Sequence, residues 1–518
     1  MKKNYIYVLA ATFLMASCTS EDDLIQDRLD ANPVPVTPTV TGTSGTANFE
    51  HMVSFGASFA AGVMDGALYT DGQAFSYPAL IAQQLMTEGV GGGAFNQPDI
   101  NSVNGVSSVT AEGTVNGRFF LSLSALAPMP TVGELPGPYT GDKSQLNNFG
   151  VGGIILAQAL TPATGGPDAD INPAFNSFYQ RFATNPSADG VSGSSILSDA
   201  LATGPTFFTS SLGGNDILGY AVNGGDNDGI QITSAADFQA QYTSLISAMV
   251  ATGSKGVVMN IAPVIFLPYF RAVPYNPIPL DAASAEQLNA AYAAYNGGLQ
   301  LALANSLISE AEATRRTITF AASEGSAFVM EDESLTDLSS LGLPNYRMSE
   351  ATDLVVLPAA AAFAGGLGTA TPAGDRWVLT PQEQQDIIVA AATFSGIIQG
   401  VADATNAAAG ETLVGVVDIY PLLADVTGLT PEQATALAFT PGGIAEADGV
   451  QGIDIGGQSL APDFSPNGIY STDGIHPNPR GYALFANAFI ETINENFGAT
   501  VPTLSSDQIL SLRGIYFQ

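Results

Sequence analysis

Apolar stretches typical of β-strands alternate with amphipathic stretches typical of α-helices along most of this chain, and this alternation constrains the fold more than any other feature. Strands that alternate with helices indicate a mostly parallel sheet with helices on both faces. We therefore predict an α/β domain with three layers, α/β/α, and a sheet of about five strands. The strands we can locate are 51–55, 205–212, 256–264 and 413–423, and the helices are 76–85, 237–252, 282–312, 381–406 and 478–497.

One segment, 314–411, interrupts this alternation with charged turns and apolar runs such as LVVLPAAAAF. No linker-like stretch separates it from its surroundings, so we interpret it as a large insertion between the fourth and fifth strands rather than as an independent domain. The folded body then extends over 49–518. Long connections in such folds gather at the carboxyl ends of the strands. The insertion is therefore expected either to form a wall of a substrate groove or to pack against the outer helices.

The first 17 residues (1–17) have the pattern of a secretory signal peptide. Lys2 and Lys3 precede an apolar stretch that is too short to span a bilayer, and small residues follow it. Cys18 comes next and is the only cysteine of the chain, so it cannot form an intramolecular disulfide. Its position resembles that of the lipidated cysteine in a bacterial lipobox. We expect lipidation of Cys18, with a soluble secreted protein that carries an unpaired thiol as the alternative.

Residues 18–48 are predicted to form a flexible tether. The acidic run TSEDD resembles the surface-export signal of lipoproteins in the Bacteroidetes group, and a solvated charge run is the alternative. The Pro-, Thr- and Gly-rich stretch that follows has almost no apolar content and cannot pack a core. Together these features predict an outer-membrane lipoprotein on the surface of a Gram-negative bacterium, with acyl chains on Cys18 as its link to the membrane.

The charge balance and the motif content exclude several classes of function. A net charge of −34 argues against nucleic acid as a partner, since phosphate binding needs clustered Lys and Arg. No His/Cys cluster, P-loop or dinucleotide fingerprint is present, so we expect no metal and no cofactor. The stretch GGDNDGI, 224–230, looks like a calcium loop, but Asp237 stands where the terminal Glu is expected. A solvated acidic loop is the favoured interpretation there.

The chain has two histidines that could act as a general base near neutral pH. His51 begins the first strand, and we interpret it as a strand-edge residue. His476 follows Asp473 by three residues, so the carboxylate can accept a hydrogen bond from Nδ1–H and leave Nε2 free to take a proton. Ser58 is the candidate nucleophile, because the stretch SFGASFAAG places it on a tight turn directly after the first strand.

Two glycine-containing stretches supply candidate hydrogen-bond donors for an oxyanion. Asn215, in GGND after a predicted strand, has a side-chain amide that can donate to a developing negative charge. In NNFGVGGI, glycines such as Gly153 let a backbone N–H approach a substrate without interference from a Cβ atom. An ordinary tight turn is the alternative for each stretch.

Taken together and in this order, these four motifs resemble those of the SGNH hydrolase family, also called GDSL-type esterases. The most specific match is IYSTDGIHPNPRGYALFANAF, followed by SLGGNDILGY. The resemblance covers about 51–264 and 413–497 and leaves out the insertion.

The resemblance implies a flavodoxin-like fold and a role for each candidate residue. Ser58 would be the nucleophile, His476 the general base, and Asp473 the acid that orients it. The oxyanion hole would consist of the Ser58 N–H, Gly153 and Asn215. Each of these residues stands at the matching position of a family motif.

One departure from the family pattern is Ala57, where the family usually has an Asp that forms structural hydrogen bonds. This change bears on the stability of the turn and on the level of activity rather than on mechanism. The resemblance implies a lipase-like serine esterase that cleaves acyl esters of a lipid or an acylated glycan. The alternative is a non-catalytic surface lipoprotein that binds a lipid or glycan as the accessory subunit of an outer-membrane channel.

Overall fold

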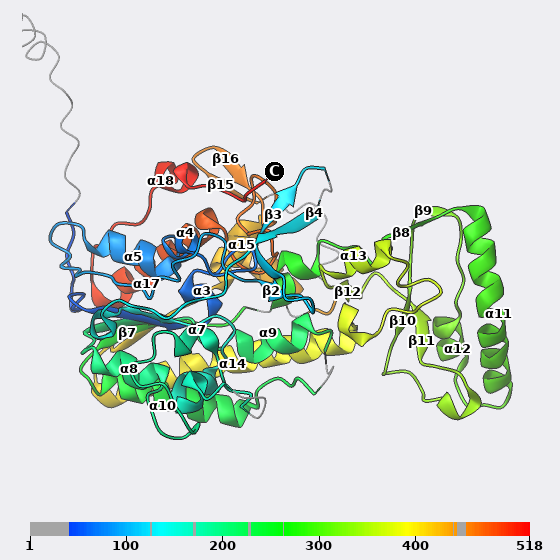
Figure 1. The fold of residues 1–518 in the computed structure, drawn as a ribbon, viewed down its shortest axis with the longest axis horizontal. Coiled ribbons are helices and arrows are strands. Elements are labelled where there is room, and N and C mark those ends of the chain that lie inside the picture. The colour runs from blue at the N-terminus through cyan, green and yellow to red at the C-terminus, as the bar shows by residue number, and fades with distance from the viewer. Residues whose placement is uncertain are drawn as a thin grey trace, which may run out of the picture. The chain divides into compact units, whose positions relative to one another are not determined.

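A five-stranded parallel sheet lies at the centre of the fold, with the strand order β14-β7-β6-β1-β5 (Figure 1). Helices lie on both faces of this sheet, which confirms the predicted three-layer α/β/α class. The strands are β1 (Met52–Gly56), β5 (Asn148–Gly150), β6 (Phe207–Ser210), β7 (Lys255–Met259) and β14 (Val414–Val417). The structure, a computed structural model, describes residues 41–124, 127–168, 172–225, 229–262, 264–438, 440–442 and 452–517.

The observed strands differ from the predicted ones mainly in length. The strand predicted over 413–423 ends at Val417, and the helix α15 (Tyr420–Thr427) begins three residues later with Pro421 in its first turn. Proline fits the first turn of a helix because the N–H that it lacks would have no helical partner there. The strand β5, second in chain order, lies within the stretch that we interpreted only as a glycine-rich turn. With β5 included, the interruption of the alternation falls between the fourth strand, β7, and the fifth, β14, as predicted.

Two pairs of helices cover the two faces of the sheet (Figure 1). On one face, α5 (Tyr77–Leu85) packs against α17 (Pro479–Phe497); on the other, α10 (Ala235–Val250) packs against α14 (Pro381–Ala409). The helix α14 is long and apolar enough to span a membrane by length and composition alone, but here it packs against β14 and α10. Side-chain caps fix where these helices begin, since the side chains of Ser76, Ser234, Thr380 and Asn478 accept hydrogen bonds from N–H groups of the first turns.

Shorter elements connect these layers. The described helices in the connections are α3 (Ser58–Ala61), α4 (Thr70–Gln73), α6 (Leu156–Leu160), α7 (Ser177–Gln180), α8 (Ile196–Ala202), α9 (Asn215–Val222), α16 (Pro431–Ala438) and α18 (Ser506–Ser511). A three-stranded antiparallel sheet and a two-stranded one lie outside the central sheet, formed by β2 (Ser108–Val109), β3 (Val115–Ser122), β4 (Ala127–Val132), β15 (Ile453–Ile455) and β16 (Gln458–Leu460).

The interruption between β7 and β14 runs from the short 3₁₀ helix η3 (Val264–Phe266) to β13 (Val378–Leu379), and we call residues 264–379 the excursion. It contains a second 3₁₀ helix, η4 (Pro268–Phe270), and part of it packs around an apolar cluster of its own, which includes Tyr292, Leu299 and Phe320. Its other elements are β8 (Ile278–Leu280), α11 (Ala282–Ala304), α12 (Glu310–Arg316), β9 (Ser323–Ser326), β10 (Val329–Glu331), η5 (Ser339–Leu341), β11 (Tyr346–Met348), β12 (Leu354–Val355), α13 (Ala359–Ala364) and η6 (Asp375–Trp377).

The predicted limits of the insertion, 314–411, are therefore wrong at both ends. The helix α11 belongs to the excursion, because its buried side chains lie in the separate apolar cluster. The helix α14 belongs to the body, because it packs against α10 and β14 and serves as the crossover that leads into the fifth strand.

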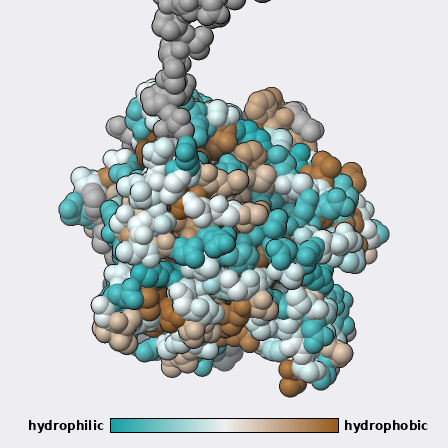
Figure 2. Space-filling model, turned by 90° about the vertical axis from the view of Figure 1, so that its left-hand side faces the viewer, coloured by the Kyte–Doolittle hydropathy of each residue, from teal (hydrophilic) through white to brown (hydrophobic). Residues whose placement is uncertain are grey.

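Hydrophobic residues on the face drawn in Figure 2 form small groups separated by hydrophilic ones. The main apolar core lies beneath the surface, between the central sheet and its helices, and includes Phe55, Phe149, Phe208, Phe394 and Phe489. The predicted signal peptide, Cys18 and most of the predicted tether lie outside the described residues, so these predictions stay untested.

Candidate active site

The turn that carries Ser58 follows directly from the end of β1. Ser58 is the first residue of the short helix α3, and only Ala57 separates it from the last residue of the strand, Gly56. A Cβ atom at position 56 would lie 2.4 Å from the Cβ of Ala60 and 2.7 Å from the Oγ of Ser211. Glycine is therefore required where the chain turns so sharply, and the turn presents Ser58 at the carboxyl edge of the sheet.

The structure brings the three predicted catalytic side chains together. The Nε2 atom of His476 lies 2.8 Å from the Oγ of Ser58, and its Nδ1 atom lies 2.8 Å from Oδ2 of Asp473. Ser58 and His476 are 418 positions apart in the chain, so the fold and not local sequence creates this contact. A carboxylate that accepts from Nδ1–H leaves Nε2 as the acceptor that faces the serine hydroxyl.

Asp473 is held as a carboxylate by several hydrogen bonds. Its Oδ1 accepts from the backbone N–H groups of Ile475 and His476, both at 2.8 Å, and its Oδ2 also accepts from the N–H of Gly66 at 2.7 Å. Burial raises the pKa of this carboxyl group, but the charge and hydrogen bond of His476 and the backbone donors outweigh burial and lower the pKa below its usual value. The residue can therefore stabilise a positive charge that forms on the imidazole.

Asp65 supports the loop that carries Asp473 and His476 and was missed by the sequence analysis. Its backbone N–H donates to the Ser471 hydroxyl at 2.8 Å, and its Oδ1 accepts from the backbone N–H and the hydroxyl of Thr472. The hydroxyl of Tyr69 donates to the other oxygen of Asp65. The Asp-Gly dipeptide at 65–66 marks a turn in the sequence, but nothing local reveals a partner some 400 residues away.

The excursion contacts the same loop on its other side. The N–H of Tyr269 donates to the carbonyl of Gly474 at 2.9 Å, and the N–H of Leu357 donates to the carbonyl of Tyr269 at 2.8 Å. Gly474 has a φ of +71°, and a Cβ atom there would lie 2.9 Å from the nitrogen of Tyr269. The loop that carries Asp473 and His476 is thus clamped between the Asp65 turn and the excursion.

Asn215 begins the helix α9 after β6, and its amide points to the loop that follows β5. Its Nδ2 donates to the carbonyl of Ile154 at 2.9 Å, and the next residue, Asp216, accepts from the N–H of Leu156 at 2.9 Å. Asn215 lines the same cavity as Ser58, and its amide has a second N–H that the bond to Ile154 does not use. Gly153 adjoins Ile154 in the chain, has a φ of +80°, and has open space where a Cβ would project, but it does not line that cavity.

Asp216 ties the helix α9 to its surroundings from a buried position. It accepts a second hydrogen bond from the hydroxyl of Thr233 at 2.7 Å. Burial raises the pKa of Asp216 to about 6, and the hydrogen bonds from Leu156 and Thr233 oppose part of this rise. The sequence motif pointed to Asn215, whereas the role of its acidic neighbour as the anchor of the loop was missed.

His51 lies at the opposite end of β1 from Ser58, as expected for a strand-edge residue. Its Nδ1 is 3.4 Å from the side-chain nitrogen of Asn147, and burial lowers the pKa of the imidazole. It takes no part in the site.

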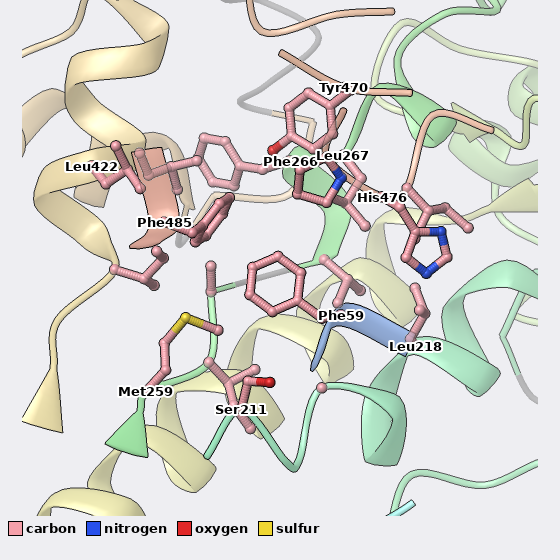
Figure 3. Close-up of a pocket in the computed structure, with 18 of the residues that line it drawn as sticks. Phe59, Ser211, Leu218, Met259, Phe266, Leu267, Leu422, Tyr470, His476 and Phe485 are labelled. Carbon is pink, nitrogen blue, oxygen red and sulfur yellow. The ribbon is translucent and has the colours of Figure 1, made fainter. Parts of the chain in front are cut away.

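A cavity of about 180 Å³ opens beside Ser58 and His476 (Figure 3). Most of the side chains around it are apolar, and those of the excursion lie at 264–267 rather than within the predicted insertion 314–411. In the view of Figure 3, Phe59 and Phe485 lie between His476 on one side and Leu422 and Met259 on the other. The apolar lining includes Phe59, Leu218, Met259, Ile261, Val264, Phe266, Leu267, Ile419, Leu422, Val426 and Phe485.

One group of acidic side chains among the described residues lies close enough together to share a metal ion. It consists of Glu333, Asp375 and Glu383, and one oxygen from each lies within 4.8 Å of the others. Glu383 also accepts hydrogen bonds from the backbone and hydroxyl of Thr380. The predicted acidic loop 224–230 is described only in part, because residues 226–228 lie outside the described residues, and its interpretation stays a prediction.

Comparison of the chain with protein-family models, with curated proteins and with solved structures finds no match.

Proposed function

We propose that this protein is a serine esterase that hydrolyses carboxylic acyl esters through Ser58, His476 and Asp473. The observation that carries the proposal is the pair of 2.8 Å contacts that join the Ser58 hydroxyl to His476 and His476 to the Asp473 carboxylate. This arrangement matches the nucleophile, general base and orienting acid that acyl transfer requires.

In the proposed reaction, Oγ of Ser58 attacks the ester carbonyl while Nε2 of His476 takes the hydroxyl proton. Asp473 stabilises the imidazolium that forms, and the same Nε2 then gives the proton to the departing alcohol. Water attacks the acyl-enzyme with His476 again as the base, which releases the acid and restores Ser58. We assign the donors to the oxyanion as the Ser58 N–H, the Gly153 N–H and the free N–H of the Asn215 amide.

We further propose that the protein is an SGNH-type hydrolase and a lipoprotein of the outer membrane, exposed on the cell surface. The order of the motifs, from the serine turn to the D-x-x-H loop, supports the first part of this proposal. The pattern before Cys18 and the acidic run after it support the second. Ester-bearing lipids or acylated glycans are the proposed substrates, and an outer-membrane protein is a further proposed partner.

A second candidate function is supported by the apolar cavity. A surface lipoprotein that binds a lipid without cleaving it, as an accessory subunit of an outer-membrane channel, would also need an apolar cavity of this kind. The hydrogen-bonded chain from Ser58 to Asp473 favours the esterase, because lipid binding alone does not require it.

The test is covalent labelling with a fluorophosphonate, which reacts with activated serines. We expect the wild-type protein to be labelled at Ser58 and the Ser58→Ala variant to remain unlabelled. Ser247→Ala, a change at an exposed serine of α10, is the matched control and should be labelled like the wild type. Equal labelling of wild type and Ser58→Ala, or no labelling of either, would overturn the proposed function.

A further inference from the structure

The apolar cavity runs along the carboxyl edge of the central sheet, away from the catalytic histidine. Ser58 follows β1, Ser211 follows the neighbouring strand β6, Met259 ends β7, and Leu422 lies on α15 after the edge strand β14. All four side chains line the same cavity. It therefore crosses three strand-to-strand intervals from the nucleophile to the edge of the sheet.

The dimensions of the cavity suit an extended hydrocarbon chain. Strands in a sheet lie about 4.8 Å apart, so three intervals span roughly 14 Å. Because carbon–carbon bonds are about 1.5 Å long, that distance fits on the order of ten carbons in an extended chain. The volume sets a similar scale, since about 180 Å³ slightly exceeds the roughly 150 Å³ of a cavity that binds benzene and so encloses on the order of six to eight carbons.

The position of His476 decides which part of an ester enters this cavity. The departing alcohol must receive its proton from Nε2 of His476, so it leaves on the histidine side of Ser58. The acyl group then extends in the other direction. Met259 and Leu422 lie on that far side in the view of Figure 3.

We propose that this cavity is the acyl pocket of the enzyme and that its substrates are esters of linear acyl chains of about ten carbons. Met259 and Leu422, at the far end, limit the length of the chain. The proposal rests on the proposed esterase function and adds the class of substrate. Burial of each methylene in such a pocket favours the longer chain about fourfold, so acetyl esters are poor substrates.

The first test compares kcat/KM for p-nitrophenyl acetate, hexanoate, decanoate and palmitate. We expect the decanoate to exceed the acetate at least about tenfold and the palmitate to fall below the decanoate. In Leu422→Phe and Met259→Phe, a larger side chain fills the far end, so the ratio of decanoate to acetate should drop about tenfold. A preference of the wild type for acetate would overturn the acyl pocket.

The controls are the same substitutions at exposed positions. Leu301 is 68% exposed on α11 and Met86 is 66% exposed after α5, so Leu301→Phe and Met86→Phe should keep the decanoate-to-acetate ratio within about twofold of the wild type. A ratio in Leu422→Phe equal to that in Leu301→Phe would also overturn the proposal. Because each variant is judged by a ratio of two substrates, partial loss of folded protein does not affect the result.

A binding experiment separates the pocket from the catalysis. We expect decanoate to bind the Ser58→Ala variant in isothermal titration calorimetry and to bind at least about tenfold more weakly when Leu422→Phe is added. If it does so while the wild type neither hydrolyses esters nor reacts with fluorophosphonate, the pocket stands and the esterase proposal fails. If Ser58 reacts and acetate is hydrolysed but decanoate does not bind, the acyl pocket fails and the esterase proposal stands.

Discussion

The candidate site and the excursion hold their buried carboxylates in opposite ways. At the carboxyl edge of the sheet, Asp65 and Asp216 accept hydrogen bonds from backbone N–H groups and hydroxyls. In the excursion, the Arg347 guanidinium lies between two buried carboxylates and contacts Asp353 at 2.6 and 2.7 Å and Asp332 on its other side. Neutral hydrogen-bond donors hold the carboxylates at the site, and the positive charge of Arg347 holds those in the excursion.

Under the proposed function, this difference has a physical reason. Asp473, like Asp65, is held by backbone donors, and its remaining partner is His476, which takes the serine proton in the proposed reaction. An arginine beside Asp473 would satisfy the carboxylate in advance and weaken its effect on the imidazolium. The excursion has no such constraint. Arg347 and its two carboxylates take no part in the proposed reaction, and their ion pairs fix one arrangement of the chain.

The largest effect is expected from Ser58→Ala. Removal of the nucleophile should lower kcat for a preferred ester on the order of 10⁵-fold, and His476→Ala should be about as severe. Ser58→Ala should keep the wild-type melting temperature, since the Ser58 hydroxyl packs no core, whereas His476→Ala removes a partner of the buried Asp473 carboxylate and should lower it. Ester hydrolysis and thermal unfolding, measured on the same preparations, provide the check. Wild-type turnover in Ser58→Ala would contradict the assignment.

The next largest effect is expected in the excursion, where Arg347 contacts two buried carboxylates. Arg347→Leu leaves the buried Asp353 carboxylate without its counter-charge, while Asp332 keeps its ion pair with Arg315, and it should destabilise the excursion by about 3–5 kcal/mol. Hydrogen exchange should show the loss in residues 264–379 before the sheet. Lys255→Met removes an ion pair with Glu411, whose side chain is 59% exposed, and it should cost at most about 1 kcal/mol. If both variants exchange alike, the buried pair does not hold the excursion together.

A smaller effect is expected from the loss of one oxyanion donor. Asn215→Ala should lower kcat about 10²–10³-fold, with KM changed much less, because the donor acts mainly in the transition state. Asn223→Ala, at the other end of α9, is the matched control and should turn over like the wild type. A change confined to KM would make Asn215 a residue of substrate binding instead.

The sequence was sufficient to predict which three side chains meet at the candidate site. Ser58 follows a strongly apolar strand, and Asp473 and His476 are three residues apart, so their chemistry can be recognised locally. The sheet class was also predictable, because apolar strands and amphipathic helices alternate along the sequence. The strand β5 was not predicted, because its sequence, NFG, lacks the apolar pattern of the others.

The support of the site could not be predicted, because it depends on contacts between distant parts of the chain. Asp65 meets Thr472 across 407 positions, and the excursion meets Gly474 through Tyr269. The limits of the excursion were also misplaced, since the Ala-rich helix α11 and the crossover helix α14 have similar compositions. Only their packing partners distinguish them.

A pH-dependent effect comes from a carboxylate that belongs to neither pattern. Glu383, near the start of α14, accepts from the backbone and hydroxyl of Thr380, as at the site, but its neighbours Glu333 and Asp375 are acidic. Burial raises its pKa to about 8, and the two acidic neighbours add to the rise against the Thr380 hydrogen bonds. The folded protein therefore holds this proton far more tightly than the unfolded chain, whose glutamates have a pKa of about 4.3.

Glu383→Gln tests this carboxylate, because glutamine keeps an oxygen for Thr380 and cannot ionise. In the wild type, the contribution of protonated Glu383 is complete below about pH 4.3 and is lost as the pH rises through about 8. The variant cannot lose this contribution. Its free energy of unfolding should therefore rise relative to that of the wild type as the pH rises from about 4.3 to about 8. Glu432→Gln is the control, because the pKa of Glu432 is shifted in the opposite direction. Glu432 is exposed, and hydrogen bonds from its own backbone N–H and from Thr430 lower its pKa. The effect of this substitution on the free energy of unfolding therefore falls at more acidic pH. Denaturant unfolding of the three proteins from pH 4 to 9 gives the comparison. A constant difference between Glu383→Gln and wild type over this range would show that Glu383 is already ionised in the fold.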